Sequence, residues 1–258
     1  MKEKITSSQN KRVKQWRALT SKKGRKQTQS YLLEGWHLVQ EALKADQPIT
    51  AILGTADQLA AHAAVLPSDV DCFELTDSIA KTIGDANTPQ GIFATVPLPH
   101  AAPVDPQTAQ GGWLFLDQVQ DPGNIGTMVR TADAAGLTGV VFGRGSASRY
   151  LPKVLRSMQG SQFHVQLVEA DLHDWIQAFT ARHLPVYGTN LDPQAQDYRN
   201  VDPVPLAAGA VVMGNEGNGM APDLQRLTTR NLYIPIKGQA ESLNVAVAAG
   251  IVMFRLFG

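Results

Sequence analysis

From residue 113 onward, short apolar runs alternate with segments of helical periodicity, and no other feature of the sequence restricts the fold as strongly. Such alternation predicts a mostly parallel sheet with helices on both faces. Ligands of such sheets bind beyond the carboxyl ends of the strands, so we expect the site among the loops that follow strands. Strands are predicted at 113–116, 140–142, 185–187, 210–213 and 232–236. Helices are predicted at 125–132, 172–179 and 242–257.

Residues 1–96 predict a smaller α/β domain. Thr76 or Asp77 is a candidate cap for a short helix that runs to Ile83. Three prolines between residues 97 and 103 sustain neither a helix nor an interior strand, so we predict a linker at 97–112 and a second domain at 113–258. Apolar spacing predicts helices at 13–19 and 36–43, and strands at 51–53, 72–75 and 91–96.

Composition excludes several classes of protein. The 258 residues include one cysteine, Cys72, which excludes an internal disulfide and a cysteine-cluster metal site. The six histidines show no pairing at ligand spacing, so we expect no metal. The apolar stretch 245–254 is far shorter than the ~20 residues of a membrane span, and no signal peptide opens the chain. We therefore expect a protein that is located in the cytoplasm and does not span a membrane.

The net charge of zero hides an asymmetry. The first 30 residues hold ten cations and one acid, or +9, so the remaining 13 cations and 22 acids give −9. Cationic segments release counterions from phosphate backbones, so we expect contact with RNA or DNA rather than a merely solvated face. Trp16 lies three residues from Val13 and from Leu19, which favours a core position over stacking on a base. The candidate RNA-binding residues are Lys11, Arg12, Lys14, Arg17, Lys22, Lys23, Arg25 and Lys26.

The loop at 117–126 leads into a predicted helix that carries Arg130. Gly123 and Gly126 let the backbone approach a ligand closely, and Asn124 is a candidate N-cap. An arginine near a helix N-terminus suits a phosphate group. The alternative is a capped helix with a surface arginine.

Two further loops follow strands. The loop at 213–220 holds three glycines in six residues, but it lacks the lysine of a P-loop, and Glu216 would repel a nucleotide phosphate. It suits a ligand that is met mainly through backbone groups; an elaborate turn is the alternative. In the loop at 234–247, Pro235 ends strand pairing, and Ser242 is a candidate N-cap of the last helix.

Together the three loops resemble the motifs of the SpoU/TrmH family of S-adenosylmethionine-dependent RNA ribose 2′-O-methyltransferases. One stretch, Ser157-Met-Gln-Gly-Ser161, departs from the Ser-Ala-Gly-Ala that family members often show. The matching segments are Asp121-Pro-Gly-Asn-Ile-Gly-Thr-Met-Val-Arg130, Met213-Gly-Asn-Glu-Gly217, Ile234-Pro-Ile236 and Glu241-Ser-Leu-Asn-Val245. Weaker signals of the family's N-terminal substrate-binding domain are Ile5-Thr-Ser-Ser-Gln-Asn10, Glu34-Gly35 and Thr88-Pro-Gln-Gly91.

The resemblance implies a C-terminal trefoil knot whose loops bind S-adenosylmethionine, and a homodimer formed through this domain. It implies an RNA substrate, with ribosomal RNA ahead of transfer RNA because a separate basic N-terminal domain suits a folded target. The implied cofactor-binding residues are Thr189, Asn190, Leu191, Gly214, Glu216, Gly217, Ile234, Ile236, Ser242, Leu243 and Asn244.

The resemblance makes Arg130 catalytic, with Asn124, Glu216, Ser242 and Asn244 also facing the reacting centre. The sulfonium methyl is already electrophilic, so the protein must align a ribose 2′-oxygen with it and help the proton leave. A guanidinium, with a pKa above ~12, is a poor base. We therefore expect Arg130 to clamp the adjacent phosphate and to stabilise the developing alkoxide. The proton passes to phosphate or water, or else to Glu216.

Three alternatives stay open at this point. A base methyltransferase with the same knot would need an acid poised for a ring nitrogen, and the first motif favours ribose instead. A ribose methyltransferase could act on transfer RNA. A non-catalytic RNA-binding protein for ribosome assembly is disfavoured because every motif residue is intact.

Overall fold

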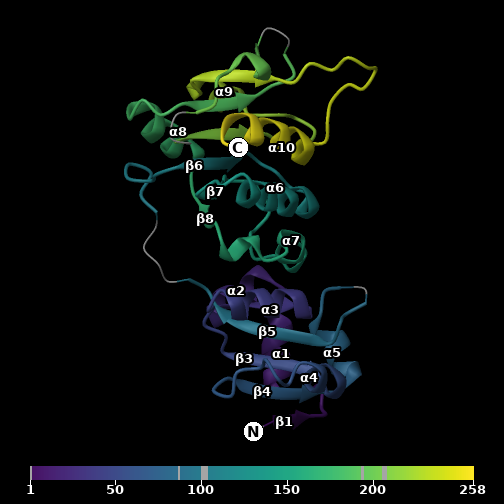
Figure 1. Ribbon diagram of the computed structural model, residues 1–258. Helices are drawn as coiled ribbons and strands as arrows, with labels where there is room; N and C mark the ends of the chain where they lie inside the picture. The colour runs from purple at the N-terminus through teal and green to yellow at the C-terminus, as the bar shows by residue number, and fades with distance from the viewer. Residues whose placement is uncertain (1, 87, 100–103, 193–194, 205–207) are drawn as a thin grey trace. The chain divides into compact units, whose positions relative to one another are not determined.

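The protein folds into two compact units (Figure 1). The first comprises residues 1–101 and 150–163, and the second comprises residues 102–149 and 164–258. The first unit therefore includes a segment that lies, in sequence, within the second. The computed structural model describes residues 2–86, 88–99, 104–192, 195–204 and 208–258.

The first unit is built on a five-stranded sheet with the strand order β1-β4-β3-β5-β2. β1 and β3 pair in parallel with β4, whereas β5 pairs antiparallel with β3 and β2. The strands are β1 (Lys2–Ile5), β2 (Ser30–Glu34), β3 (Ala51–Thr55), β4 (Asp71–Leu75) and β5 (Ile92–Pro97). The helices are α1 (Lys11–Ala18), α2 (Lys22–Thr28), α3 (Trp36–Lys44), α4 (Ala56–Ala61), α5 (Asp77–Ile83) and α7 (Pro152–Met158), followed by the 3-10 turn η1 (Ser161–Phe163).

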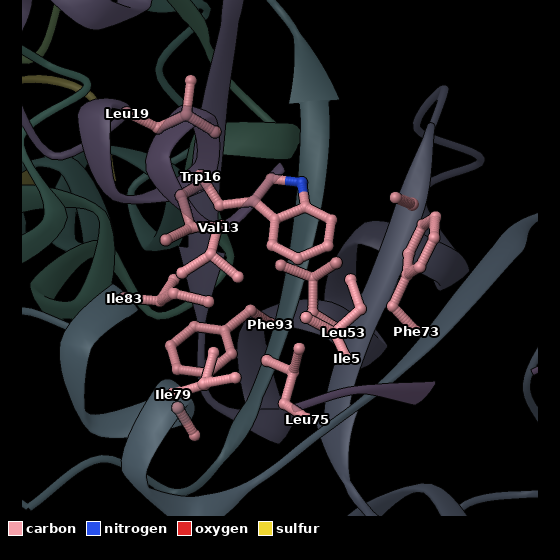
Figure 2. Packing of buried hydrophobic residues seen from close by; sticks show 13 residues of the cluster. Ile5, Val13, Trp16, Leu19, Leu53, Phe73, Leu75, Ile79, Ile83 and Phe93 are labelled. Atoms are coloured by element: carbon pink, nitrogen blue, oxygen red, sulfur yellow. The ribbon is translucent and has the colours of Figure 1, made fainter. Parts of the chain in front are cut away.

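A hydrophobic cluster joins α1 and α5 to the sheet of this unit (Figure 2). Val13, Trp16 and Leu19 are all buried, as their spacing predicts, and they share the cluster with residues of the strands. The Trp16 ring is tilted against that of Phe73, with the ring centroids 5.2 Å apart. An aromatic pair of this kind adds about 0.5–1.5 kcal/mol to the gain from burial. The prediction that Trp16 belongs to the core is confirmed.

The second unit is built on a seven-stranded sheet in which every pairing among the described residues is parallel. Its strand order is β10-β12-β9-β11-β6-β7-β8. The predicted fold class, an α/β protein with a parallel C-terminal sheet and a smaller N-terminal α/β unit, is confirmed. The strands are β6 (Gly112–Leu116), β7 (Gly139–Phe142), β8 (Gln166–Glu169), β9 (Val186–Thr189), β10 (Gln196–Asp197), β11 (Gly209–Met213) and β12 (Arg230–Tyr233). The helices are α6 (Pro122–Ala134), α8 (Leu172–Ala181), α9 (Pro222–Leu227) and α10 (Val245–Leu256), with a 3-10 turn η2 (Tyr198–Asn200).

Helices cover this sheet as the alternation predicts (Figure 1). α8 and α9 contact each other, and α10 packs against α6 and β11. Trp113 and Phe115, two residues apart on β6, both contact Trp175 of α8 through their rings. These aromatic side chains are almost fully buried and form the centre of the second core.

The domain boundaries 1–96, 97–112 and 113–258 and the trefoil knot stay predictions. β5 ends at Pro97 and β6 begins at Gly112, so the predicted linker lies between them. Residues 100–103 of that linker lie outside the described residues. In the part of the chain that the structure describes, no helix has the length and apolar character needed to span a membrane.

Two predicted helix caps are wrong by two or three residues. α6 is capped by Asp121, whose carboxylate accepts the backbone N–H of Asn124, so Asn124 lies in the first turn. α10 is capped by Asn244 and not by Ser242, and the Asn244 side chain accepts the N–H groups of Ala246 and Val247. In both places two neighbouring polar residues have suitable side chains, and only the backbone path decides which of them caps.

His173 joins the first turns of α8 and α9. Its Nδ1 lies 3.0 Å from Asp171, the N-cap of α8, and its Nε2 lies 2.7 Å from Asp223 in the first turn of α9. Hydrogen bonds to Asp171 and then to Asp223 raise the pKa of His173. The pKa of Asp171 is lowered mainly by a hydrogen bond from the backbone N–H of His173. The pKa of Asp223 is lowered mainly by its hydrogen bond to the His173 imidazole. α9 directly follows the glycine-rich loop, so this clamp helps to fix where that loop ends.

We predict that His173→Asn lowers the melting temperature only within a window of pH. Because the pKa of His173 is higher in the folded state than in the unfolded state, its contribution to stability is complete at pH values below the unfolded-state pKa. This contribution is lost as pH rises through the folded-state pKa. The lowered carboxylate pKa values cause loss as pH falls through them. The melting temperatures of wild type and variant should therefore differ most between about pH 5 and 6 and converge as pH rises through the raised, folded-state pKa of His173. His183→Asn, at an exposed position with no side-chain hydrogen bond among the described contacts, is the control, and a melting-temperature difference that does not vary with pH for His173→Asn would refute the clamp.

Candidate functional site

A cavity of about 520 Å³ lies at the edge of the second sheet where β9, β11 and β12 end. Its wall is formed by the segment after β9, the glycine-rich loop after β11 and the loop between β12 and α10. Parallel strands deliver these three segments to one edge. Two of them are the predicted loops at 213–220 and 234–247, whereas no residue of the predicted loop at 117–126 is in the described lining. The described lining includes ten of the eleven predicted cofactor-binding residues: Thr189, Asn190, Leu191, Gly214, Glu216, Gly217, Ile234, Ile236, Ser242 and Leu243.

The eleventh residue, Asn244, is not in the wall, because its side chain caps α10 and contacts the first motif. Other residues of the wall were not predicted from the sequence. Met213 and Met220 are the ends of the glycine-rich loop, and Leu232 lies just before the loop at 234–247. Their positions beside predicted loops could have identified them as wall residues. Gln225 lies on α9 with no such signal. Other lining residues not predicted are Asn215, Asn218, Gly219, Glu241, Val245, Ala248 and Val252.

The glycine-rich loop folds tightly back on itself. Asn215 and Gly219 form an isolated antiparallel bridge, and the Asn215 side chain accepts the N–H groups of Gly217 and Asn218. A Cβ atom on Gly214 would lie 2.2 Å from the backbone nitrogen of Met220. Only glycine therefore allows the two ends of this loop to approach so closely.

Glu216 links this loop to the first motif. Its carboxylate accepts the backbone N–H groups of Gln120 and Asp121 at 3.3 and 3.0 Å, and the side-chain amide of Asn124 at 3.2 Å. Burial alone would raise the pKa of Glu216, but these hydrogen bonds outweigh burial, and the pKa is lowered. Asn124 in turn accepts the side-chain amide of Asn244 at 2.9 Å. One chain of hydrogen bonds therefore joins all three motifs.

A second polar contact closes the far end of the glycine-rich loop. Asp117, at the end of β6, is 4% exposed, and its carboxylate accepts the backbone N–H of Ala221 at 2.7 Å. Asp117 is the first residue of the loop at 117–126, but it is not among the predicted site residues. Its carboxylate fixes the point where the loop passes into α9.

Arg130 lies on α6 with an exposed side chain, outside the wall of the cavity. Among the contacts of the described residues it has no hydrogen bond and no ion pair. An exposed guanidinium that no carboxylate neutralises is available to an incoming phosphate.

The basic N-terminal segment divides between surface and core. Arg25 is 3% exposed, and its guanidinium donates to the carbonyls of Leu19 and Thr20, so the prediction that it contacts RNA is wrong. Arg12 is exposed but pairs with Glu3 and lies over the ring of Phe73. The other predicted RNA-binding residues all have exposed side chains: Lys11, Lys14, Arg17, Lys22, Lys23 and Lys26. Among the described residues no group of His, Cys, Asp and Glu could hold a metal.

Comparison with known proteins identifies the family. Residues 113–254 match the SpoU rRNA Methylase family, and residues 10–94 match the MRM3-like substrate binding domain. The chain is 40% identical to the 23S rRNA (guanosine(2553)-2′-O)-methyltransferase RlmP of Bacillus subtilis, across 98% of this chain and 99% of that protein. It is 27% identical to the 23S rRNA (uridine(2479)-2′-O)-methyltransferase of Streptomyces viridochromogenes, across 96% and 90%.

The fold agrees with these sequence relationships. The crystal structure of an AdoMet-bound rRNA methyltransferase from Sinorhizobium meliloti superimposes with a TM-score of 0.85 and 31% identity, covering 98% of this chain and 97% of that one. This protein belongs to the SpoU rRNA methylase family, as its three motifs indicate.

We predict that Gly214→Ala lowers the affinity for S-adenosylmethionine, the cofactor in the Sinorhizobium structure, by at least about tenfold. The added methyl group would overlap the backbone at residues 219 and 220 and force the wall of the cavity open. Isothermal titration calorimetry on the folded variant measures the loss. Gly238→Ala is the control, because a Cβ there meets no neighbouring atom. Equal affinities of Gly214→Ala and wild type would contradict the role of the loop.

Proposed function

We propose that this protein is an S-adenosylmethionine-dependent RNA methyltransferase that acts on a ribose 2′-hydroxyl of ribosomal RNA. The supporting observation is the cavity whose wall is built largely from the second and third family motifs, to which the first motif is hydrogen-bonded through Glu216 and Asn124. Two relatives that match nearly the whole chain carry names for 2′-O-methylation of 23S ribosomal RNA, one at a guanosine and one at a uridine. The shared chemistry is ribose methylation, and the base differs between them.

The cavity suits the charge of this cofactor. Its described wall holds two carboxylates, Glu216 and Glu241, and contains no lysine or arginine. A sulfonium and an ammonium group are compatible with such a wall, whereas the phosphates of a nucleoside triphosphate would be repelled. Leu232, Ile234 and Ile236 supply apolar surface for an adenine ring.

The residues around the cavity have separate roles in the proposed reaction. When bound, S-adenosylmethionine supplies an electrophilic methyl group on a positively charged sulfur. Arg130 would clamp a phosphate next to the target ribose and stabilise the alkoxide that develops at its 2′-oxygen. Asn124 and Asn244 would hold the first motif against α10, since they hydrogen-bond to each other. Ser242, exposed in the wall, would hydrogen-bond to the bound molecule.

Glu216 is better suited to positioning than to accepting the proton. Its carboxylate already accepts three hydrogen bonds from the first motif, and its pKa is lowered. A carboxylate stabilised in this way is a weaker base than usual. The 2′-hydroxyl proton would therefore pass to phosphate or water, and the electron pair left on the 2′-oxygen would form the new bond to the methyl carbon. The bond between that carbon and sulfur would break at the same time, with its electron pair kept by the sulfur of the departing neutral thioether.

An apolar face of α10 supports the expected homodimer. Val247 and Phe254, two turns apart on this helix, are about half exposed, at 53% and 52%. Residues seven apart lie on one helix face, so the two side chains form a stripe that a second copy would cover. Phe254→Lys should then shift the protein from dimer to monomer in sedimentation velocity. A dimer that persists would place the interface elsewhere.

We also propose a cytoplasmic location, where ribosomal RNA is modified.

The function is tested by mass spectrometry of RNA. Large-subunit ribosomal RNA from a strain without the gene should lack one ribose methyl group, which purified protein and S-adenosylmethionine should restore. Transfer RNA from the same strain should be unchanged. Loss of a methyl group from transfer RNA alone would overturn the choice of substrate.

We predict that Arg130→Ala lowers single-turnover methylation by about 10²–10³-fold, because the developing alkoxide loses its main charged donor. The affinity for S-adenosylmethionine should stay within about twofold, since Arg130 is outside the cavity wall. Arg130→Lys should also fail, because a point charge cannot bind phosphate through two hydrogen bonds. Arg226→Ala, which removes another exposed arginine, is the control. Wild-type turnover in Arg130→Ala would remove Arg130 from the mechanism.

A fourfold substitution tests the basic surface of α1 and α2. Changing Lys14, Arg17, Lys22 and Lys23 to glutamine should weaken RNA binding and flatten its salt dependence. Each phosphate contact contributes ~0.7–0.9 to the slope of log affinity against log salt. The slope should therefore fall by about one to three, and cofactor affinity should not change. An unchanged slope and affinity would show that RNA binds another surface.

A further inference from the structure

A second cavity, of about 210 Å³, is lined only by residues of the first unit. None of its described lining residues belongs to the cavity proposed for the cofactor. It opens at the junction of β2 and α3, and side chains of α7 and of the loop before β5 complete its wall. At ~30 Å³ per molecule it has room for roughly seven waters. This is below the ~300–1,000 Å³ of sites for drug-sized ligands, and it suits one small ring system.

Among the described residues of this wall, Arg156 is the only lysine or arginine, and carboxylates pair with it. Arg156 donates to Glu34 at 2.6 Å and to Asp85 at 3.1 Å, so one guanidinium faces two carboxylates. The Glu34 side chain is 4% exposed and also accepts the backbone N–H groups of Asp85 and Ala86. A phosphate would find no unpaired cation here, whereas a neutral polar group would meet no repulsion.

The wall also presents hydrogen-bonding groups in fixed orientations. The side-chain carbonyl of Gln90 accepts the backbone N–H of Trp36 at 2.9 Å, so the NH₂ group of Gln90 points away from Trp36 N. This NH₂ group has no hydrogen-bond partner among the described contacts. His37 Nε2 lies 3.0 Å from the carbonyl of Gln159. Because a carbonyl only accepts, Nε2 carries a hydrogen, which leaves Nδ1 as the ring nitrogen that can accept a hydrogen bond. The exposed hydroxyl of Thr88 completes a set of one donor, one acceptor and one group that can be either.

We propose that this cavity binds a single unpaired nucleobase of the RNA substrate, by its hydrogen-bonding edge. A nucleobase is neutral, planar and small, and it carries adjacent donors and acceptors. Proteins that read RNA sequence take up unstacked bases in this way. The inference rests on the proposed RNA substrate, and all of the described wall except Arg156 and Gln159 lies within residues 10–94, which match a substrate-binding domain. It assigns base recognition to a site separate from the cavity for the cofactor.

Two variants alter this cavity in different ways. Gln90→Glu keeps the oxygen that accepts from Trp36 and replaces the free donor by an acceptor, with almost no change of shape. Ala86→Phe fills the cavity with a ring. Gln58→Glu, on α4 of the same unit and outside the cavity, is the control for added negative charge. The probe is large-subunit ribosomal RNA purified from a strain that lacks the gene.

RNA affinity is measured by filter binding, alongside methylation of the same RNA, cofactor affinity and melting temperature. We expect Gln90→Glu and Ala86→Phe each to weaken RNA binding by roughly tenfold, the size of one lost base contact, while Gln58→Glu does not. Cofactor affinity should be unchanged in all three. Equal RNA affinities for wild type and a folded Gln90→Glu variant would overturn the nucleobase pocket. A wild-type protein that binds this RNA without methylating it would overturn the proposed function instead.

Discussion

The hydrogen bonds of one carboxylate hold the candidate active site together. Glu216, in the loop after β11, binds the backbone and a side chain of the loop after β6. Asn124 passes the connection on to Asn244, which caps the last helix. Glu216 lies between 92 and 96 residues away in the chain from the groups that it binds in this loop. Because charged acceptors form stronger hydrogen bonds than neutral ones, this carboxylate is a physical reason for the acid in a glycine-rich loop.

The parallel sheet decides where these loops meet. β6, β9, β11 and β12 run in one direction, so their following loops emerge at one edge. The sheet is rigid because helices cover it and its aromatic core is almost fully buried. A cofactor that is bound largely through backbone groups depends on such a support, since no single side chain can be adjusted to correct a displaced loop.

Much of this arrangement could be predicted from sequence, because strand and helix periodicities are local properties. Ten of the predicted cofactor-binding residues lie in the cavity wall, because motif positions at strand ends identified the loops that form it. What failed depends on the path of the backbone or on partners far away in the chain. The choice of Asn244 over Ser242 as a cap is one example. Arg25 is another, since its charge suggested the surface while carbonyls at Leu19 and Thr20 bind it in the interior. Asp117 had no local signal, because its partner lies 104 residues further on.

The segment 150–163 has a consequence for the evolution and engineering of this protein. It connects two adjacent strands of the second sheet, yet it belongs to the first unit, where Arg156 neutralises the buried carboxylate of Glu34. A buried charge that loses its partner is strongly destabilising. The two units are therefore not interchangeable modules. A chimera that exchanges the N-terminal part at the linker would combine a first unit with a foreign α7. Residues 34 and 156 must then vary together, although they are inherited on opposite sides of the junction.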